Sequence, residues 1–278
     1  MDHFDALLFD CDGVIAETER DCHRVTFNQA FKEKGLPNEW DVELYGELLA
    51  TGGGKERMTV YFDKVGWPEG VADKQEFVKE LHKRKTALFQ SAVESGAVPS
   101  RPGVTRLMDD AFAIGLKVAI CSTSNEAAVT TIARVLLGPE RLARLQIFAG
   151  DVVENKKPSP DVYLLAAKTL NVDPARCWVV EDSAIGNRAA KAAGMKCLVT
   201  KSVYTEGEDF EGADVVIKDL ENGLDGPITT TYLNYKASPN AFKAVKPVDN
   251  AEMFAAKDNT VDMFSRIAKG DMGKGFPF

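Results

Sequence analysis

Short apolar runs alternate with helical patterns along most of this chain, and that alternation constrains the fold more than any other feature. Each run is continuous and brief, which is typical of a strand buried on both faces of a parallel sheet. The runs lie at 6–9, 116–121, 147–149, 177–180, 197–199 and 213–217, and the helical patterns between them lie at 104–114, 127–137, 160–170 and 184–193. The sequence therefore predicts an α/β fold with a Rossmann-like parallel sheet covered by helices on both faces.

Two parts of the chain break this alternation. Residues 17–96 have helical patterns at 21–34 and 74–94 but no convincing parallel strand, and a linker with two prolines and a glycine follows at 97–103. We therefore expect a helical cap at 17–96, inserted into a catalytic core made of 1–16 and 97–224. Residues 225–278 are predicted to form a C-terminal extension of unknown role. In it, 229–247 has no clear period and 251–269 has the pattern of one amphipathic helix.

Charge and cysteine usage exclude several classes of protein. Asp and Glu number 42 against 34 Lys and Arg, a net charge of −8 that argues against nucleic-acid and anionic-membrane partners. No apolar run reaches the roughly 18 residues of a membrane span, and the first residues lack the pattern of a signal peptide. The five cysteines are odd in number and without CxxC spacing, which favours an intracellular, reducing environment.

Polar residues stand where several of the apolar runs stop. Asp10 and Asp12 follow the first run, Ser122 follows the second, and Glu181 and Asp182 follow a later one. Because the carboxyl ends of parallel strands meet at one crevice, we expect these side chains to converge. Carboxylates gathered in this way repel one another, and oxygen ligands favour Mg²⁺, so the sequence predicts a magnesium site there.

Lys157 adds a cation to this set from the loop 156–161, which leads into the next helix. A carboxylate, Mg²⁺, a lysine, the Ser122 hydroxyl and a helix N-terminus together suit a phosphoryl group, with one carboxylate free to attack it. Asp12, two residues after Asp10, is near enough to exchange a proton with the attacking or leaving oxygen. Each signal alone is ordinary for a turn, a helix cap or a solvated loop charge, and only the conjunction favours an active site.

Four segments of the chain resemble the four motifs of haloacid-dehalogenase-superfamily phosphatases. They are 10–13, 121–125, 157–158 and 180–183, and the helical insertion after the first resembles that superfamily's C1 cap. The resemblance runs from about residue 4 to about residue 224. It implies a Mg²⁺-dependent phosphoric monoester hydrolase that works through an aspartyl-phosphate intermediate.

The resemblance also implies a role for each residue of the motifs. Asp10 would be the nucleophile, Asp12 the general acid and then base, and Ser122 with Lys157 would hold the transferring phosphoryl group. Asp182, the Asp10 side chain and the Asp12 backbone carbonyl would bind Mg²⁺, with Glu181 behind these ligands. The remaining residues of the second motif, expected at the substrate, are Thr123, Ser124 and Asn125.

A narrower resemblance is to the CbbY-type proteins of photosynthetic organisms. It rests on segments 16–19, 52–58, 65–68, 121–126 and 137–141. That family's members act as xylulose-1,5-bisphosphate phosphatases and remove an inhibitor of Rubisco. The resemblance thus implies a small phosphorylated sugar as ligand, a role beside the Calvin cycle and a place in the plastid stroma. From residue 225 on, the chain departs from that family.

A bisphosphate carries a second phosphate that the Mg²⁺ site does not reach, so the cap must supply cations for it. We expect Lys55 and Arg57 to do so, after a glycine-rich loop whose Gly53 and Gly54 let a phosphate approach closely. His82 and Lys85 share a face of the helix at 74–94, where a solvated face is an equal alternative.

Glu19 is expected to accept hydrogen bonds from sugar hydroxyls, with Glu17 as the alternative, and Tyr45 is expected in the core. Two other functions fit the same fold. One is a phosphosugar mutase of the β-phosphoglucomutase type, which returns the phosphoryl group to the sugar. The other is a catalytically inactive binding module. Of the possible oligomeric states, a monomer is favoured.

Overall fold

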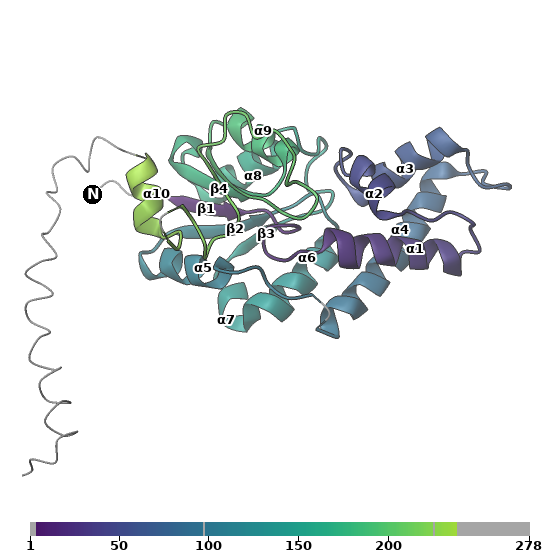
Figure 1. Ribbon diagram of the computed structural model, residues 1–278, viewed down its shortest axis with the longest axis horizontal. Helices are drawn as coiled ribbons and strands as arrows, with labels where there is room; N and C mark the ends of the chain where they lie inside the picture. Colours follow the sequence, from purple (N-terminus) through teal and green to yellow (C-terminus); the bar gives the residue numbers. More distant parts are fainter. Residues whose placement is uncertain (1–3, 97, 225, 238–278) are drawn as a thin grey trace, which may run out of the picture. The chain divides into compact units, whose positions relative to one another are not determined.

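Six parallel strands form one sheet in the order β3-β2-β1-β4-β5-β6 (Figure 1). This arrangement comes from a computed structural model, which describes residues 4–96, 98–224 and 226–237. The strands are β1 (Ala6–Phe9), β2 (Lys117–Cys121), β3 (Gln146–Phe148), β4 (Cys177–Glu181), β5 (Lys196–Thr200) and β6 (Val215–Ile217). The parallel α/β sheet predicted from the sequence is confirmed, with each strand within a few residues of its apolar run.

Helices cover the sheet on both faces, as the continuous apolar strands require. Leu7 and Phe9 of β1 pack in one buried cluster with α5 (Val104–Ala113) and α6 (Glu126–Ile132). Ala6 and Leu8 point into a second cluster with α8 (Asp161–Leu170) and α9 (Ala184–Ala192). The pattern predicted as one helix at 127–137 is divided into α6 and the π-helical turn η2 (Ala133–Leu137), which the short α7 (Gly138–Leu142) follows.

Between β1 and β2 the chain forms a group of helices, called here the helical insert. Its elements are the π-helical turn η1 (Glu19–His23), α1 (Arg24–Glu33), α2 (Val42–Leu48), α3 (Gly54–Val65) and α4 (Lys74–Glu94). An aromatic cluster of its own, with Phe27, Phe31, Trp40 and Phe62 fully buried, holds these helices together. The sequence patterns predicted the regions of α1 and α4 but neither α2 nor α3.

The two linkers of the helical insert lie side by side. Ala16 and Ser100 form an antiparallel bridge, and the backbone N–H of Arg101 donates to the Ile15 carbonyl at 2.8 Å. The chain therefore enters and leaves the insert at one place, next to the end of β1.

The start of the predicted C-terminal extension belongs to the core. Although 229–247 shows no clear period, the structure has helix α10 (Thr230–Ala237) there, packed against α5 with Leu233 fully buried. The Phe4 backbone N–H donates to Asn234 Oδ1 at 3.2 Å. The amphipathic pattern at 251–269 lies outside the described residues. Within the described part of the chain, no helix has the length and apolar character needed to cross a membrane.

Candidate active site

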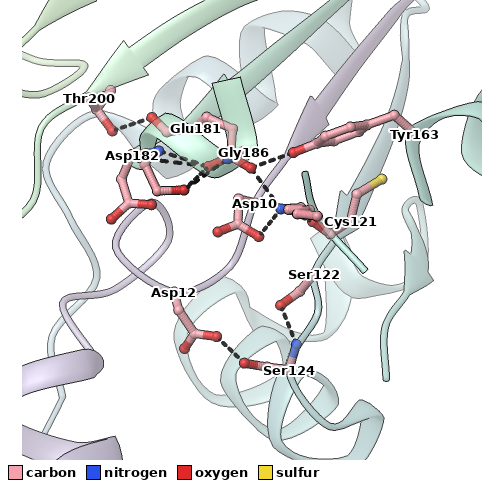
Figure 2. Close-up of polar contacts among 12 residues, drawn as sticks. Asp10, Asp12, Cys121, Ser122, Ser124, Tyr163, Glu181, Asp182, Gly186 and Thr200 are labelled. Carbon is pink, nitrogen blue, oxygen red and sulfur yellow. Dashed lines mark hydrogen bonds and ion pairs between the residues drawn. The ribbon is translucent and has the colours of Figure 1, made fainter. Parts of the chain in front are cut away.

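The polar residues at the strand ends converge at the carboxyl edge of the sheet. Asp10 follows β1, Ser122 follows β2, Glu181 ends β4, and Asp182 comes next. Figure 2 shows the carboxylates of Asp10, Glu181 and Asp182 gathered together, with Asp12 and Ser124 close by. Parallel strands place these ends together, as the spacing of the apolar runs predicted.

Lys157 joins the two central strands of this site by its side chain. Its Nζ donates to Asp10 Oδ1 and to Glu181 Oε1, both at 2.7 Å, and to the Cys121 carbonyl at 3.0 Å. Burial lowers the pKa of Lys157, but the charges on Asp10 and Glu181 outweigh burial and hold that pKa above its ordinary value. The ammonium is therefore charged and held in a fixed position beside Asp10.

Glu181 has its hydrogen bonds within the protein rather than toward the crevice. Its Oε1 accepts from Lys157 and from the Tyr163 hydroxyl at 2.6 Å. Its Oε2 accepts from the Asp182 backbone N–H at 3.1 Å and from the Ser183 hydroxyl at 3.2 Å. The side chain is fully buried, so Glu181 orients Lys157 from behind.

Asp10 and Asp182 are buried carboxyl groups close to other carboxylates, an arrangement that a bound cation would stabilise. Burial raises the pKa of Asp10 to about 8; the Lys157 ammonium opposes that rise, and the charges of Glu181 and Asp12 add to it. Burial and the charges of Glu181 and Asp10 also raise the pKa of Asp182. Oxygens of Asp10, Glu181 and Asp182 lie within 4.8 Å of one another, so this set could hold a metal ion. Oxygen donors of this kind fit Mg²⁺.

Asp12 stands apart from the carboxylates of Asp10, Glu181 and Asp182 and is hydrogen-bonded on both oxygens. Its Oδ1 lies 2.7 Å from His23 Nε2 and accepts from the Thr18 hydroxyl, and its Oδ2 accepts from the Ser124 hydroxyl. Burial raises the pKa of Asp12, but His23, Ser124 and Thr18 together lower it well below its ordinary range. These three partners favour the ionised form of Asp12 and fix its orientation.

His23 is a site residue that sequence reasoning missed. Its ring stacks on Phe89 with centroids 4.1 Å apart, and its Nδ1 contacts Lys85 Nζ while its Nε2 meets Asp12. The turn η1 brings His23 close to Asp12, and the spacing of residues in the sequence does not predict a π-helical turn.

A cavity of about 370 Å³ opens over these residues and is bordered by the helical insert on its other side. Of the residues predicted to meet substrate, all but Lys55 line it: Glu19, Gly53, Gly54, Arg57, His82, Lys85, Thr123, Ser124 and Asn125. Ser122 also lines the cavity, and its Oγ accepts from the Ser124 backbone N–H at 3.0 Å. Asn125 Oδ1 caps α6 by accepting from Ala127 N.

Lys55 and Arg57 are in the first turn of α3 rather than in a loop, because helix α3 begins at Gly54 directly after the positive-φ residue Gly53. The Lys55 side chain extends away from the helical insert, and its Nζ contacts Asp151 in the part of the protein that contains the sheet. Lys55 is not among the residues that line the cavity. Arg57 is buried instead and donates from Nη1 to the Tyr45 hydroxyl at 2.7 Å.

The two glutamates of the first linker are told apart by their partners. Glu19 lines the cavity, contacts the Tyr45 hydroxyl, and lies 3.7 Å from Arg57 Nη1. Glu17 lies 3.3 Å from Arg101 Nε at the linker. Tyr45 is fully buried, as expected, and its hydroxyl joins Glu19 to Arg57.

His82 and Lys85 face the cavity from α4 and are buried, 8% and 4% exposed, so they do not form a solvated helix face. Burial lowers the pKa of His82 to about 3, with the Lys85 charge adding to the effect, and His82 is therefore neutral. Burial lowers the pKa of Lys85 to about 8, and the nearby Glu19 and Asp12 charges limit that fall. The insert thus presents Arg57, His82 and Lys85 to the same cavity as Asp10.

Comparison with known proteins agrees with the fold. A family model described as haloacid dehalogenase-like hydrolase matches residues 4–194. A CBBY-like protein of Arabidopsis thaliana is 62% identical over 215 residues, which cover 76% of this chain and 67% of that protein. Protein CbbY of Rhodobacter capsulatus is 44% identical over 216 residues, covering 77% of this chain and 93% of the relative.

Among solved structures, a variant of CbbY from Rhodobacter sphaeroides in complex with xylulose-(1,5)bisphosphate superimposes with a TM-score of 0.73. It is 38% identical, and the match covers 80% of this chain and 98% of that one.

Proposed function

The chain belongs to the haloacid dehalogenase-like hydrolase family, and from that premise we propose that it is a Mg²⁺-dependent phosphatase of sugar bisphosphates, with xylulose 1,5-bisphosphate as its substrate. Its similarity to CbbY proteins, one of them solved with xylulose bisphosphate, supports a phosphatase of this kind. The observation that carries the proposal is the cavity itself. Anionic groups and Lys157 border it on the sheet side, and Arg57, His82 and Lys85 border it on the other.

At the reacting end, Asp10 acts as the nucleophile. One of its carboxylate oxygens attacks the phosphorus, the phosphorus–oxygen bond to the sugar breaks, and Asp12, kept protonated by the negative charge of the neighbouring phosphate, gives its proton to the departing sugar oxygen. Lys157, hydrogen-bonded to Asp10, and the Ser122 hydroxyl meet the phosphoryl oxygens as negative charge moves onto them. The products of this step are the sugar monophosphate and the aspartyl-phosphate.

In the second step Asp12 acts as a base. It takes a proton from a water that attacks the aspartyl-phosphate, and the bond between phosphorus and Asp10 breaks to release inorganic phosphate. The hydrogen bonds from Thr18 and Ser124 favour the ionised form of Asp12 that this step uses. The proton taken from the water leaves Asp12 protonated for the next cycle, and His23 Nε2, 2.7 Å from Asp12 Oδ1, holds this carboxyl group in place.

Asp10 and Asp182, with the backbone carbonyl of Asp12, would hold Mg²⁺. When bound, the ion neutralises these carboxylates and the phosphoryl oxygens, which would otherwise repel one another. Burial and the neighbouring carboxylates raise the pKa values of Asp10 and Asp182, and this supports the assignment because both causes disfavour negative charge that no cation balances.

The second phosphate of the substrate binds to the helical insert. Arg57 and Lys85 supply positive charge, neutral His82 supplies one donor, and Gly54 leaves open the space beside the His82 ring. Glu19 accepts from the sugar hydroxyls between the two phosphates. We further propose that residues 17–96 act as a cap that closes over bound substrate and excludes bulk water during the first step.

The proposal is tested by phosphate release from xylulose 1,5-bisphosphate with Mg²⁺ and then with EDTA. We expect turnover that EDTA abolishes, none in Asp10→Asn, and wild-type turnover in the control Asp63→Asn, whose carboxylate is half exposed on the insert surface. An isomeric phosphosugar without free phosphate would favour the mutase instead. Absence of both products would favour an inactive binding module.

We also propose that the protein works in the plastid stroma beside Rubisco, as the CbbY resemblance implies. Its similarity to the Arabidopsis thaliana protein is what supports a plant-type setting. Fractionation of source cells, with immunodetection of the endogenous protein, should recover it with the stromal markers, and recovery with cytosolic markers would contradict this placement.

A further inference from the structure

One arginine at the exit of the helical insert gathers three loops of the core. Arg101 is 8% exposed, and its Nη1 donates to the carbonyls of Gly13 and Thr200, the latter at 3.1 Å. Its Nη2 donates to the carbonyls of Lys201 at 2.7 Å and Lys218 at 2.8 Å. These acceptors follow β1, β5 and β6, so the planar guanidinium joins the carboxyl ends of three strands, as few other side chains are able to do.

The first of these loops forms a wall of the site. A Cβ atom on Gly13 would stand 1.9 Å from Asp182 Oδ2, and Gly13 has a φ of +75°. The backbone of Gly13 therefore lies directly against the Asp182 carboxylate. A shift of Gly13 would change the space that this carboxylate has.

The second loop also contacts Asp182. Ser202 directly follows Lys201, and its side chain is hydrogen-bonded to Asp182. The Thr200 hydroxyl, 3.2 Å from Arg101 Nη1, also lies 3.4 Å from the Glu181 carbonyl. The guanidinium thus holds the backbone of two loops that contact Asp182, although it does not touch Asp182 itself.

The backbone of Arg101 ties the same residue to the linkers of the helical insert. Its N–H donates to the Ile15 carbonyl, and its neighbour Ser100 is bridged to Ala16. These backbone bonds remain whatever side chain stands at position 101. The role of the guanidinium can therefore be separated by substitution from the pairing of the linkers.

We propose that Arg101 is a positioning residue for the metal site, which fixes the loops of Gly13 and Ser202 against the Asp182 carboxylate and joins that geometry to the linker of the helical insert. The proposal rests on the proposed function only in taking Asp10 and Asp182 as the ligands of Mg²⁺. It assigns Arg101 no contact with substrate or metal.

The test measures Mg²⁺ binding without substrate, as the rise of the melting temperature with Mg²⁺ concentration. Arg101→Met is compared with Arg106→Met. Arg106 also donates to two backbone carbonyls, those of Leu220 at 2.9 Å and Ile228 at 3.0 Å, but it does not line the cavity. We expect Arg101→Met to need about tenfold more Mg²⁺ for half-saturation, within the range seen when outer partners of metal ligands are removed.

The melting temperature of Arg106→Met should be lower than that of the wild type. Its half-saturating Mg²⁺ concentration should stay within about twofold of the wild-type value. If Arg101→Met does not fold, Arg101→Lys takes its place, since it keeps the charge but has too few donors for all the acceptors. A folded Arg101 variant with wild-type Mg²⁺ affinity, or an equal loss of affinity in Arg106→Met, would overturn the proposal. Either result would show that Arg101 contributes stability alone.

The readout separates this inference from the proposed function. A wild-type protein that binds Mg²⁺ but releases no phosphate contradicts the function, while the Arg101 comparison still decides the inference. Turnover by wild type with unchanged Mg²⁺ affinity in the Arg101 variants contradicts only the inference. If the melting temperature of the wild-type protein does not change with Mg²⁺, that result contradicts both the proposed function and the inference about Arg101.

Discussion

His23 connects Asp12 to the helical insert, because its ring meets Asp12 on one edge and Lys85 on the other. In the proposed mechanism this hydrogen bond orients Asp12 for proton transfer. The ring is also fixed by stacking on Phe89. His23 is thus a single residue through which the position of α4 bears on the acid–base group of the core.

His23→Asn removes the ring that reaches Asp12, so we expect kcat to fall by about a hundredfold, in the range of a lost proton-transfer aid, with little change in KM. The measurement is steady-state kinetics on the bisphosphate. The matched control is His82→Asn, another buried histidine of the cavity that does not contact Asp12. It should act mainly on KM, and a KM effect alone in His23→Asn would contradict the role given to His23.

Lys85 predicts a pH dependence of substrate binding. Because burial brings its pKa to about 8, the ammonium that faces the cavity is lost as the pH rises through that value. KM should then rise by up to about tenfold between pH 7 and pH 9, and the rise should be absent in Lys85→Arg, whose guanidinium stays charged. The groups around Lys85 are Glu19, Asp12, Arg57 and His23.

The same group changes folding stability in the opposite sense. Its pKa is lower in the folded than in the unfolded protein, so the folded state binds fewer protons between pH 8 and the ordinary lysine value of 10.5. Lys85 therefore favours the folded state increasingly as the pH rises through that window.

A KM that stays flat from pH 7 to pH 9 in the wild type would show that the Lys85 ammonium is not used in binding.

At the scale of elements, helix α3 brings its first turn close to α4 at the cavity. A Cβ on Gly54 would lie 2.6 Å from His82 Nε2 and 3.2 Å from Phe27 Cζ, so the absence of a side chain permits this approach. Gly54→Ala should therefore raise KM and lower the free energy of unfolding by about 1–3 kcal/mol, the usual cost of overpacking, despite the better helix propensity of alanine.

Gly46→Ala is the control for Gly54→Ala. Gly46 also lies in a helix of the insert, α2, and lines the cavity, but the nearest atom to a Cβ there is 3.4 Å away, which is ordinary contact. The control should be neutral or should stabilise the protein by about 0.5–1 kcal/mol in chemical denaturation. Equal destabilisation of both variants would mean that helix propensity, not the approach to His82, decides the outcome.

These elements also show what a sequence can and cannot predict here. Strands such as β1 are continuous apolar runs whose ends carry Asp10 and Asp182, so both the sheet and the convergence of its acids follow from local pattern. Helix α3 begins at the third of three consecutive glycines that favour a loop, and tertiary packing of its apolar face overrides that preference. The meeting of His23 with Asp12 depends on the π-helical turn η1, for which the sequence has no periodic signal.

At the scale of the whole molecule, the site and the support of the sheet are at opposite ends of the strands. The carboxyl ends carry Asp10 and its neighbours, whereas α10 hydrogen-bonds the chain just before β1 begins, through Asn234 Oδ1 and the Phe4 N–H. Leu233 of α10 is fully buried in the same cluster as α5 and the odd-numbered residues of β1. The described end of the chain therefore contributes stability without entering the cavity.

Leu233→Ala should therefore lower the free energy of unfolding by about 2–5 kcal/mol, because it removes buried methyl groups and leaves a cavity in that cluster. Denaturant unfolding measures this loss, and kcat and KM of the folded fraction should be unchanged. Leu164→Ala is the matched control, since Leu164 of α8 is 41% exposed and its truncation should change stability by less than about 1 kcal/mol. Equal, small effects at both positions would mean that α10 adds little to the core, whereas a changed KM at Leu233 would mean that its packing reaches the site through the sheet.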